Sequence, residues 1–272
     1  MPFRYAICNE TFGDMPVEDA LRLAKDAGYT GWEVAPFMLS DDISSFSKSE
    51  RRTYRDLMTD AEMQCVGLHW LLAKTEGYHL TTRDAITRAS TTAYLCDLAE
   101  LCADLGGKVM VLGSPQQRNR TEGQSIDEAM ENAAEVLRGV VPALHSHGVR
   151  IALEPLGPAE GDFLNTADEG VRLAEMIDDD HIGLHLDVKA MSSESKPIET
   201  VIREHADSMI HFHANDPNLL GPGMGDVPFQ PIMQALSDID YDGWVSVEVF
   251  DYSPGAETLA RESIANLKSS IG

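Results

Sequence analysis

The sequence has few cysteines, no long apolar run and little positive charge. Its four cysteines, among 272 residues, are scattered and form no C-x-x-C pair, which favours free thiols in a reducing compartment over a disulfide framework. No stretch approaches the roughly 20 apolar residues of a membrane span, and the opening MPFRYAICNE has no apolar signal segment. We therefore expect a cytoplasmic protein that does not act at a membrane.

The shortage of positive charge also limits the partners. Lys and Arg total 21 against 45 Asp and Glu, which gives a net charge of −24 with neutral histidines. Such a field repels the phosphates of nucleic acids and the anionic surfaces of membranes. We expect no nucleic-acid partner, and a nuclease function is disfavoured for the same reason.

Short apolar or β-branched runs alternate with longer stretches of helical periodicity along the whole chain, residues 1–272. Eight such β-then-α units predict a single-domain (β/α)8 TIM barrel. The rival fold, a doubly wound open sheet, would require a Gly-rich phosphate-binding turn after the first strand, and CNETFGDMP contains no G-x-G-x-x-G. The predicted strands are RYAICN (4–9), GWEVAPF (31–37), CVGLHWL (65–71), KVMVLGS (108–114), RIALEPL (150–156), IGLHLDV (182–188), MIHFHAN (209–215) and WVSVEVF (244–250).

Ionisable side chains occur near the ends of the last four predicted strands, at Glu154, Asp187, His213 and Glu248. Because side chains alternate along a strand, these four face the barrel mouth while their large apolar neighbours face the helices. One such carboxylate alone is most often a helix cap or an ion-pair partner. Three carboxylates and a histidine at one height instead predict a divalent-metal site suited to Mn²⁺, Mg²⁺ or Co²⁺, with Zn²⁺ as a further candidate.

The segments ALEP, HLDV, HFHAND and SVEVF, in this order, resemble the sugar phosphate isomerase/epimerase family, within the xylose isomerase-like TIM barrel superfamily that includes ketose 3-epimerases. The resemblance covers essentially the whole chain and extends to the Gly-rich loop GPGMGDVPF. It implies one metal ion, usually Mn²⁺, held by Glu154, Asp187, His213 and Glu248. It also implies that Glu154 and Glu248 act as catalytic acid and base.

This family chemistry has a physical basis. Moving a proton beside a ketone creates an enediolate, and a metal chelated by the substrate oxygens stabilises its charge. Two carboxylates on opposite faces allow a proton to leave one side and return on the other. The expected activity is therefore a metal-dependent isomerisation or epimerisation of a sugar or polyol-ketone.

The chain departs from ketose 3-epimerases at two positions. A His and an Arg that contact substrate in those relatives are replaced here by Ala190 and Leu219. A lyase or dehydratase of the same superfamily, which eliminates water or an aglycone from an inosose or a 3-keto-glycoside, therefore stays open as an alternative. A non-catalytic sugar-binding barrel is a further alternative, and a homo-oligomer is compatible with the sequence.

Six further residues are candidates for substrate binding because they lie near predicted strand ends or on the loops that follow. For each, a structural role is the alternative: a core hydrogen bond, an ion pair, a solvated loop position or an Asx turn. Trp70 or nearby aromatics would add a sugar-stacking surface beside His69. The candidates are Glu33, His69, Arg118, His185, Lys189 and Asp216.

Overall fold

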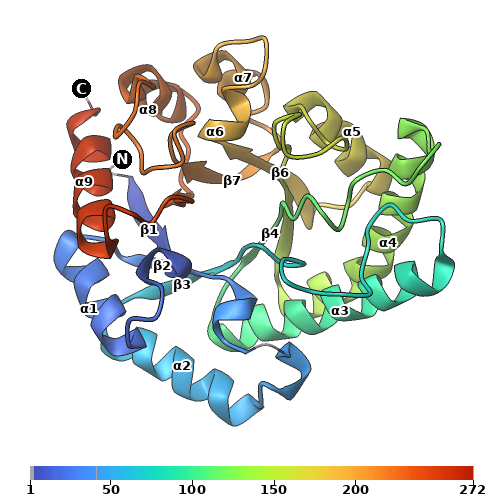
Figure 1. Cartoon of the computed structure of the whole chain (residues 1–272), viewed down its shortest axis with the longest axis horizontal. Helices are drawn as coiled ribbons and strands as arrows, with labels where there is room; N and C mark the ends of the chain where they lie inside the picture. Colours follow the sequence, from blue (N-terminus) through green and yellow to red (C-terminus); the bar gives the residue numbers. More distant parts are fainter. Residues whose placement is uncertain (1–2, 41, 272) are drawn as a thin grey trace.

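The computed structural model describes residues 3–40 and 42–271, and its eight parallel strands close into one barrel in the order β1 to β8 (Figure 1). This confirms the predicted (β/α)8 TIM barrel. The strands are β1 (Arg4–Cys8), β2 (Gly31–Val34), β3 (Gln64–Leu68), β4 (Val109–Leu112), β5 (Arg150–Leu153), β6 (Ile182–Asp187), β7 (Met209–Ala214) and β8 (Trp244–Val247).

Helices surround the strands on the outside of the barrel (Figure 1). The sequence sets both ends of the first helix: Pro16 precedes its amino end, and Gly28 ends it in a left-handed conformation at φ 108°. The helices are α1 (Val17–Ala27), α2 (Lys48–Asp60), α3 (Ala85–Leu105), α4 (Ile126–His147), α5 (Ala167–Ile177), α6 (Val188–Met191), α7 (Ile198–Glu204), α8 (Phe229–Asp238) and α9 (Ala256–Ser269).

The apolar side chains beside the four ionisable ones belong to the core. Leu153, Leu186, Phe212 and Val247 are all buried in the main hydrophobic cluster. Since neighbouring side chains on a strand face opposite sides, this places the ionisable residues on the inner face of the barrel. The alternation read from the sequence is confirmed.

The two long connections leave the carboxyl ends of their strands. One follows β3 and reaches α3, and the other follows β7 and reaches α8. Strands β5 and β8 end one residue before Glu154 and Glu248, so both glutamates stand on the first residue beyond the barrel wall. The carboxyl-terminal end of the barrel is therefore the place where loops and ionisable side chains meet.

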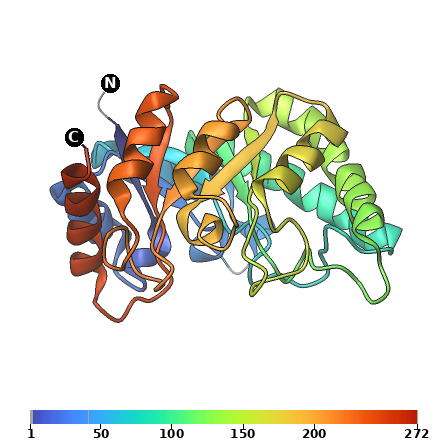
Figure 2. The same cartoon turned by 90° about the horizontal axis from the view of Figure 1, so that it is seen from above.

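The two ends of the described chain lie side by side. Strand β1 pairs with β8, and α1 packs against α9; Figures 1 and 2 both place the N and C labels next to each other. Among residues 3–40 and 42–271, none of the helices combines the length and apolar character needed to cross a bilayer.

The contact between β3 and β4 requires a glycine. A Cβ atom on Gly67 would lie 1.8 Å from the backbone oxygen of Val109, which has no freedom to move aside. We expect Gly67→Ala to lower the free energy of unfolding by about 2 kcal/mol or more, as overpacked core sites do, measured by urea denaturation.

The matched control is Gly157→Ala. A Cβ there would approach the Ser193 hydroxyl at 3.2 Å, and this side chain can rotate. We expect a change of less than about 0.5 kcal/mol. Equal unfolding midpoints for the two variants would contradict the steric account of Gly67.

Candidate active site

The carboxyl-terminal end of the barrel contains a cavity of about 380 Å³ with three glutamates in its wall, two of them at strand ends. Glu154 and Glu248 enter it from β5 and β8, and both are more than nine-tenths buried. Glu154 packs directly against Gly113, which must lack a side chain, because a Cβ on Gly113 would lie 1.5 Å from Glu154 Oε2. The other lining residues are Trp70, Ala73, Lys74, Gly113, Ser114, Pro115, Gln116, Gln117, Leu156, Glu160 and Phe250.

The four residues predicted to hold a metal lie together. Ligand atoms of Glu154, Asp187 and His213, together with one nitrogen of His185, are all within 4.8 Å of one another. Glu248 is outside this group of four but adjoins it, with its Oε2 3.1 Å from His213 Nδ1. The strand register helps, since Asp187 and His213 are direct partners between β6 and β7.

These carboxylates repel one another strongly. Burial, with Glu248 and Asp187 nearby, raises the pKa of Glu154 well above its usual range. Burial and the charge of Glu248 raise the pKa of Asp187 to about 6. Burial also acts to raise the pKa of Glu248, but the charge and hydrogen bond of His213 outweigh it and hold that pKa below its usual value. The pocket thus has an excess of negative charge that a cation would relieve.

The donor set fits a hard divalent cation. Three carboxylates and one imidazole, buried and converging from β5, β6, β7 and β8, are the ligand types that Mn²⁺, Mg²⁺ and related ions accept. Asp187 is fixed in place, because the backbone N–H of Ala190 donates to its Oδ1 at 2.8 Å and the Asn215 amide donates to Oδ2. These residues can therefore hold one divalent ion.

Glu33 lies beneath this group, where it orients two histidines. Its carboxylate is fully buried and contacts His211 Nε2 at 3.0 Å and His213 Nε2 at 3.1 Å. Holding Nε2 leaves Nδ1 of His213 directed toward Glu248, an arrangement in which a carboxylate orients a metal-binding imidazole. Substrate contact by Glu33 stays a prediction; both of its oxygens contact histidines here, and one of these contacts orients His213.

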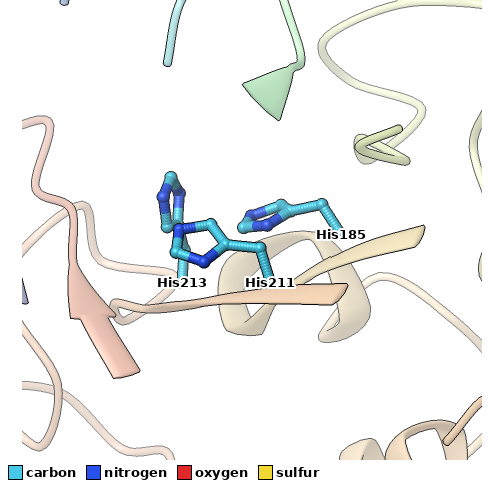
Figure 3. A group of neighbouring side chains, drawn as sticks. All are labelled: His185, His211 and His213. Atoms are coloured by element: carbon cyan, nitrogen blue, oxygen red, sulfur yellow. The ribbon is translucent and has the colours of Figure 1, made fainter. Parts of the chain in front are cut away.

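His185 is one of three neighbouring histidines on β6 and β7 (Figure 3). Its ring centroid lies 4.2 Å from that of His213 and 5.3 Å from that of His211. Within the described residues neither of its nitrogens has a hydrogen-bond partner, and Nε2 is 3.8 Å from Glu154 Oε1. Burial holds the pKa of His185 well below its usual value, so the ring is neutral beside Glu154.

Two other expected substrate contacts are buried against the protein itself. His69 has no exposed surface, and its Nε2 lies 2.8 Å from Glu10 Oε2. Arg118 is 2% exposed and donates to the backbone oxygens of Glu154 at 2.5 Å and of Leu112 at 3.3 Å. Arg118 therefore supports the backbone that carries Glu154, because its guanidinium donates to main-chain carbonyls.

The remaining two candidates lie at this end of the barrel, Lys189 on the short helix α6 and Asp216 on the loop after β7. Lys189 forms an ion pair with Glu160 at 2.6 Å and lies 4.7 Å from the ring centroid of Phe250. Asp216 is 2% exposed and faces its own loop, since a Cβ on Gly225 would lie 2.1 Å from its Oδ1. None of the six substrate-binding candidates lines the cavity within the described part of the chain, so a direct contact with substrate stays a prediction.

Trp70 is a lining residue with an unusual backbone conformation. Its backbone adopts φ 53°, which is rare for a bulky residue. Its indole Nε1 donates to Glu248 Oε1 at 2.5 Å, and its ring stacks on Phe250 at 6.1 Å and 22°. The strained turn after β3 thus aims the indole at a glutamate of the cavity.

Sequence reasoning missed several residues of this wall. Phe250 follows Glu248 by two positions, so strand alternation could have placed both on one face. Lys74 and Glu160 lie on connections with no periodicity, and nothing in the sequence indicated their direction. Trp70 was considered beside His69 as a stacking surface, but its hydrogen bond to Glu248 had no sequence signal.

Residues 21–270 match the family model described as "Xylose isomerase-like TIM barrel". The chain belongs to this family. It is 26% identical over 231 residues to the "Probable ketose 3-epimerase" of Synechocystis sp., covering 84% of this chain and 77% of the relative. It is 30% identical over 176 residues to the "D-psicose 3-epimerase" of Ruminiclostridium cellulolyticum, covering 63% and 59%.

A solved structure of D-psicose 3-epimerase in the presence of D-fructose is also similar. The match has a TM-score of 0.87 at 22% identity and covers 99% of this chain and 100% of the other. This confirms the barrel fold over its full length. The family-model match, together with the two named relatives, confirms the family resemblance read from ALEP, HLDV, HFHAND and SVEVF.

Metal binding can be tested without any assumption about substrate. For EDTA-treated protein, Mn²⁺ at about 100 times its Kd adds about 2.7 kcal/mol of stability. We expect a rise in Tm of about 5–10 °C on this basis. Asp187→Asn should remove most of the rise because it deletes a ligand charge.

The control is Glu160→Gln, which neutralises a carboxylate at the rim of the same cavity, where it pairs with Lys189. The Mn²⁺-dependent rise should persist in this variant. A similar loss in both variants would mean that Mn²⁺ responds to the general charge of the pocket rather than to the set that contains Asp187.

Proposed function

We propose that this protein is a divalent-metal-dependent sugar isomerase or epimerase that moves a proton beside a ketone, with Glu154 and Glu248 as acid and base. The observation that carries the proposal is the entry of these two buried glutamates into one cavity from β5 and β8. The names of its relatives, ketose 3-epimerase and D-psicose 3-epimerase, support a sugar ketone as substrate.

Four residues have proposed roles in metal binding, and two of these also transfer protons. Glu154, Asp187, His213 and Glu248 hold the metal, which we propose to be Mn²⁺, as the family resemblance implies. When bound, the ion supplies positive charge that stabilises negative charge developing on the substrate oxygens. One glutamate removes a proton from the carbon beside the carbonyl, and the other returns a proton on the opposite side.

The charge of the cavity favours a neutral sugar over a phosphorylated one. Among the described lining residues, Lys74 is the only cation, and its Nζ lies 4.0 Å from the ring centroid of Phe37. Glu154, Glu160 and Glu248 supply three carboxyl groups. Trp70 and Phe250 offer flat apolar faces on which the C–H groups of a sugar can pack.

The cytoplasmic location and a homo-oligomeric state stay predictions that rest on the sequence alone. The same holds for the expectation that nucleic acid is not a partner.

Proton exchange tests the proposal directly. Mn²⁺-loaded protein is incubated in D₂O with free ketoses, 3-keto-glycosides and inososes, and products are followed by NMR. We expect deuterium on the carbon beside the carbonyl together with an isomer of equal mass apart from the label. EDTA, Glu154→Gln and Glu248→Gln should each lower the rate by about 100-fold or more, the usual scale of lost acid–base catalysis.

Other products would redirect the assignment. Loss of water or of an aglycone would replace epimerisation by elimination, the lyase alternative. No exchange with any compound, in protein that binds Mn²⁺ by the Tm measurement, would contradict the sugar isomerase proposal while leaving the metal site intact.

Trp70 should act on turnover more than on binding. Trp70→Phe keeps an aromatic ring but removes the hydrogen bond to Glu248, and such a bond to a charged group contributes about 1.5–3 kcal/mol. We expect kcat to fall about 10- to 100-fold with KM changed by less than about 3-fold.

The matched control is Phe37→Leu, which alters the ring beside Trp70 at 5.8 Å without touching Glu248. It should leave kcat within about 3-fold. Equal losses of kcat in Trp70→Phe and Phe37→Leu would show that ring packing, and not the hydrogen bond, is what matters.

A further inference from the structure

The opposite end of the barrel carries a second and larger cavity, of about 780 Å³. It opens where β1, β3, β4, β5 and β8 begin, so it lies at the amino-terminal mouth, away from the metal-binding residues. His211 and Trp244 both line this cavity. The Trp244 ring packs directly against Gly31, where an added Cβ would lie 2.7 Å from it. Its volume is within the range of small-molecule sites.

Four cations line this cavity: Arg4, Arg55, Lys108 and Arg150. They come from different elements, namely the first residues of β1 and β5, the residue before β4, and α2. All four are exposed to solvent at the mouth. A chain with 21 basic residues and a net charge of −24 therefore gathers four of them around one opening.

The three guanidinium groups are oriented but barely neutralised. Arg4 donates to the backbone oxygen of Asp242 and lies over the Trp244 ring at 4.6 Å. Arg55 and Arg150 donate to the backbone oxygens of Asp104 and Asp180, at 3.3 and 3.1 Å. Backbone oxygens carry no net charge, so these bonds hold the guanidinium groups in place and leave their positive charge available.

Carboxylates cancel this charge only in part: burial lowers the pKa of Arg150, and the charge of the nearby Asp180 acts to raise it. Within the described residues, the ion pairs of these four cations amount to one contact of 4.0 Å, between Arg55 and Asp56. Glu62, which also lines the cavity, is already paired with Lys25 at 2.9 Å. Cations that share a cavity repel one another, and an anion between them would remove that repulsion.

We propose that this amino-terminal cavity binds a small polyanion with two or more phosphate groups. Guanidinium groups donate two parallel hydrogen bonds to phosphate, and an ammonium group adds a compact charge. The proposal concerns a site separate from the one that contains Glu154 and Glu248. It therefore stands or falls independently of the proposed sugar chemistry.

Calorimetric titration with inorganic pyrophosphate tests this. EDTA-treated protein at low ionic strength is used so that no metal recruits the ligand to the other end of the barrel. We expect one equivalent to bind with a Kd below about 1 mM, and binding to weaken as salt is added because exposed charges are screened. The double variant Lys108→Gln/Arg150→Gln should bind at least about 10-fold more weakly.

The control double variant is Arg172→Gln/Lys196→Gln. It makes the same change in net charge on the outer helices and loops, where these side chains pair with Asp127 and Glu204. It should bind pyrophosphate like the unaltered protein. Both double variants change side chains that are exposed or half-buried, and circular dichroism verifies their folding.

Two results would overturn the proposal. One is the absence of pyrophosphate binding up to about 10 mM at low ionic strength. The other is equal weakening in the two double variants, which would assign any binding to overall charge rather than to Lys108 and Arg150.

Discussion

The mutual repulsion of buried carboxylates is the constraint on which the carboxyl-terminal end of this barrel depends. Glu154, Asp187 and Glu248 are brought together by backbone geometry, and burial prevents water from screening them. The surrounding groups each hold one carboxylate at a fixed position: the Trp70 indole and His213 ring hold Glu248, and the Asn215 amide holds Asp187. The cost of assembling negative charge is thus offset partly by neighbours and partly by the cation that this donor set fits.

Further contacts that position these residues lie deeper in the barrel interior. Glu33 on β2 joins His211 and His213 on β7 across the interior, and His185 on β6 fills the space beside them. A buried carboxylate that accepts from two imidazoles sets which nitrogen of His213 lies beside Glu248. A change at Glu33 would therefore reach the upper site by rotating the ring of His213, even though Glu33 does not line the cavity.

The barrel and the four converging residues were predictable because strands impose a period of two. Because Leu153 and Glu154 are adjacent, their side chains face opposite sides of the strand. The position of each ionisable residue directly after an apolar run fixes its height in the barrel. The loops provide no such rule. The pairing of His69 with Glu10 and the left-handed turn at Trp70 depend on contacts between distant segments. For that reason the sequence could not place the loop and turn residues, and substrate contact by the six candidates stays a prediction.

The positions of the functional residues divide the chain unequally. Residues 154–248, in the second half, contain all four predicted metal ligands, whereas Trp70, Lys74 and residues 113–117 of the cavity wall come from the first half. The two halves meet edge to edge at β1 with β8 and at β4 with β5. Evolution can thus vary the early loops, and with them the choice of sugar, while the later half keeps the same reactive chemistry. Redesign of the choice of sugar can follow the same route, by exchanging between related barrels only the loops that precede β4.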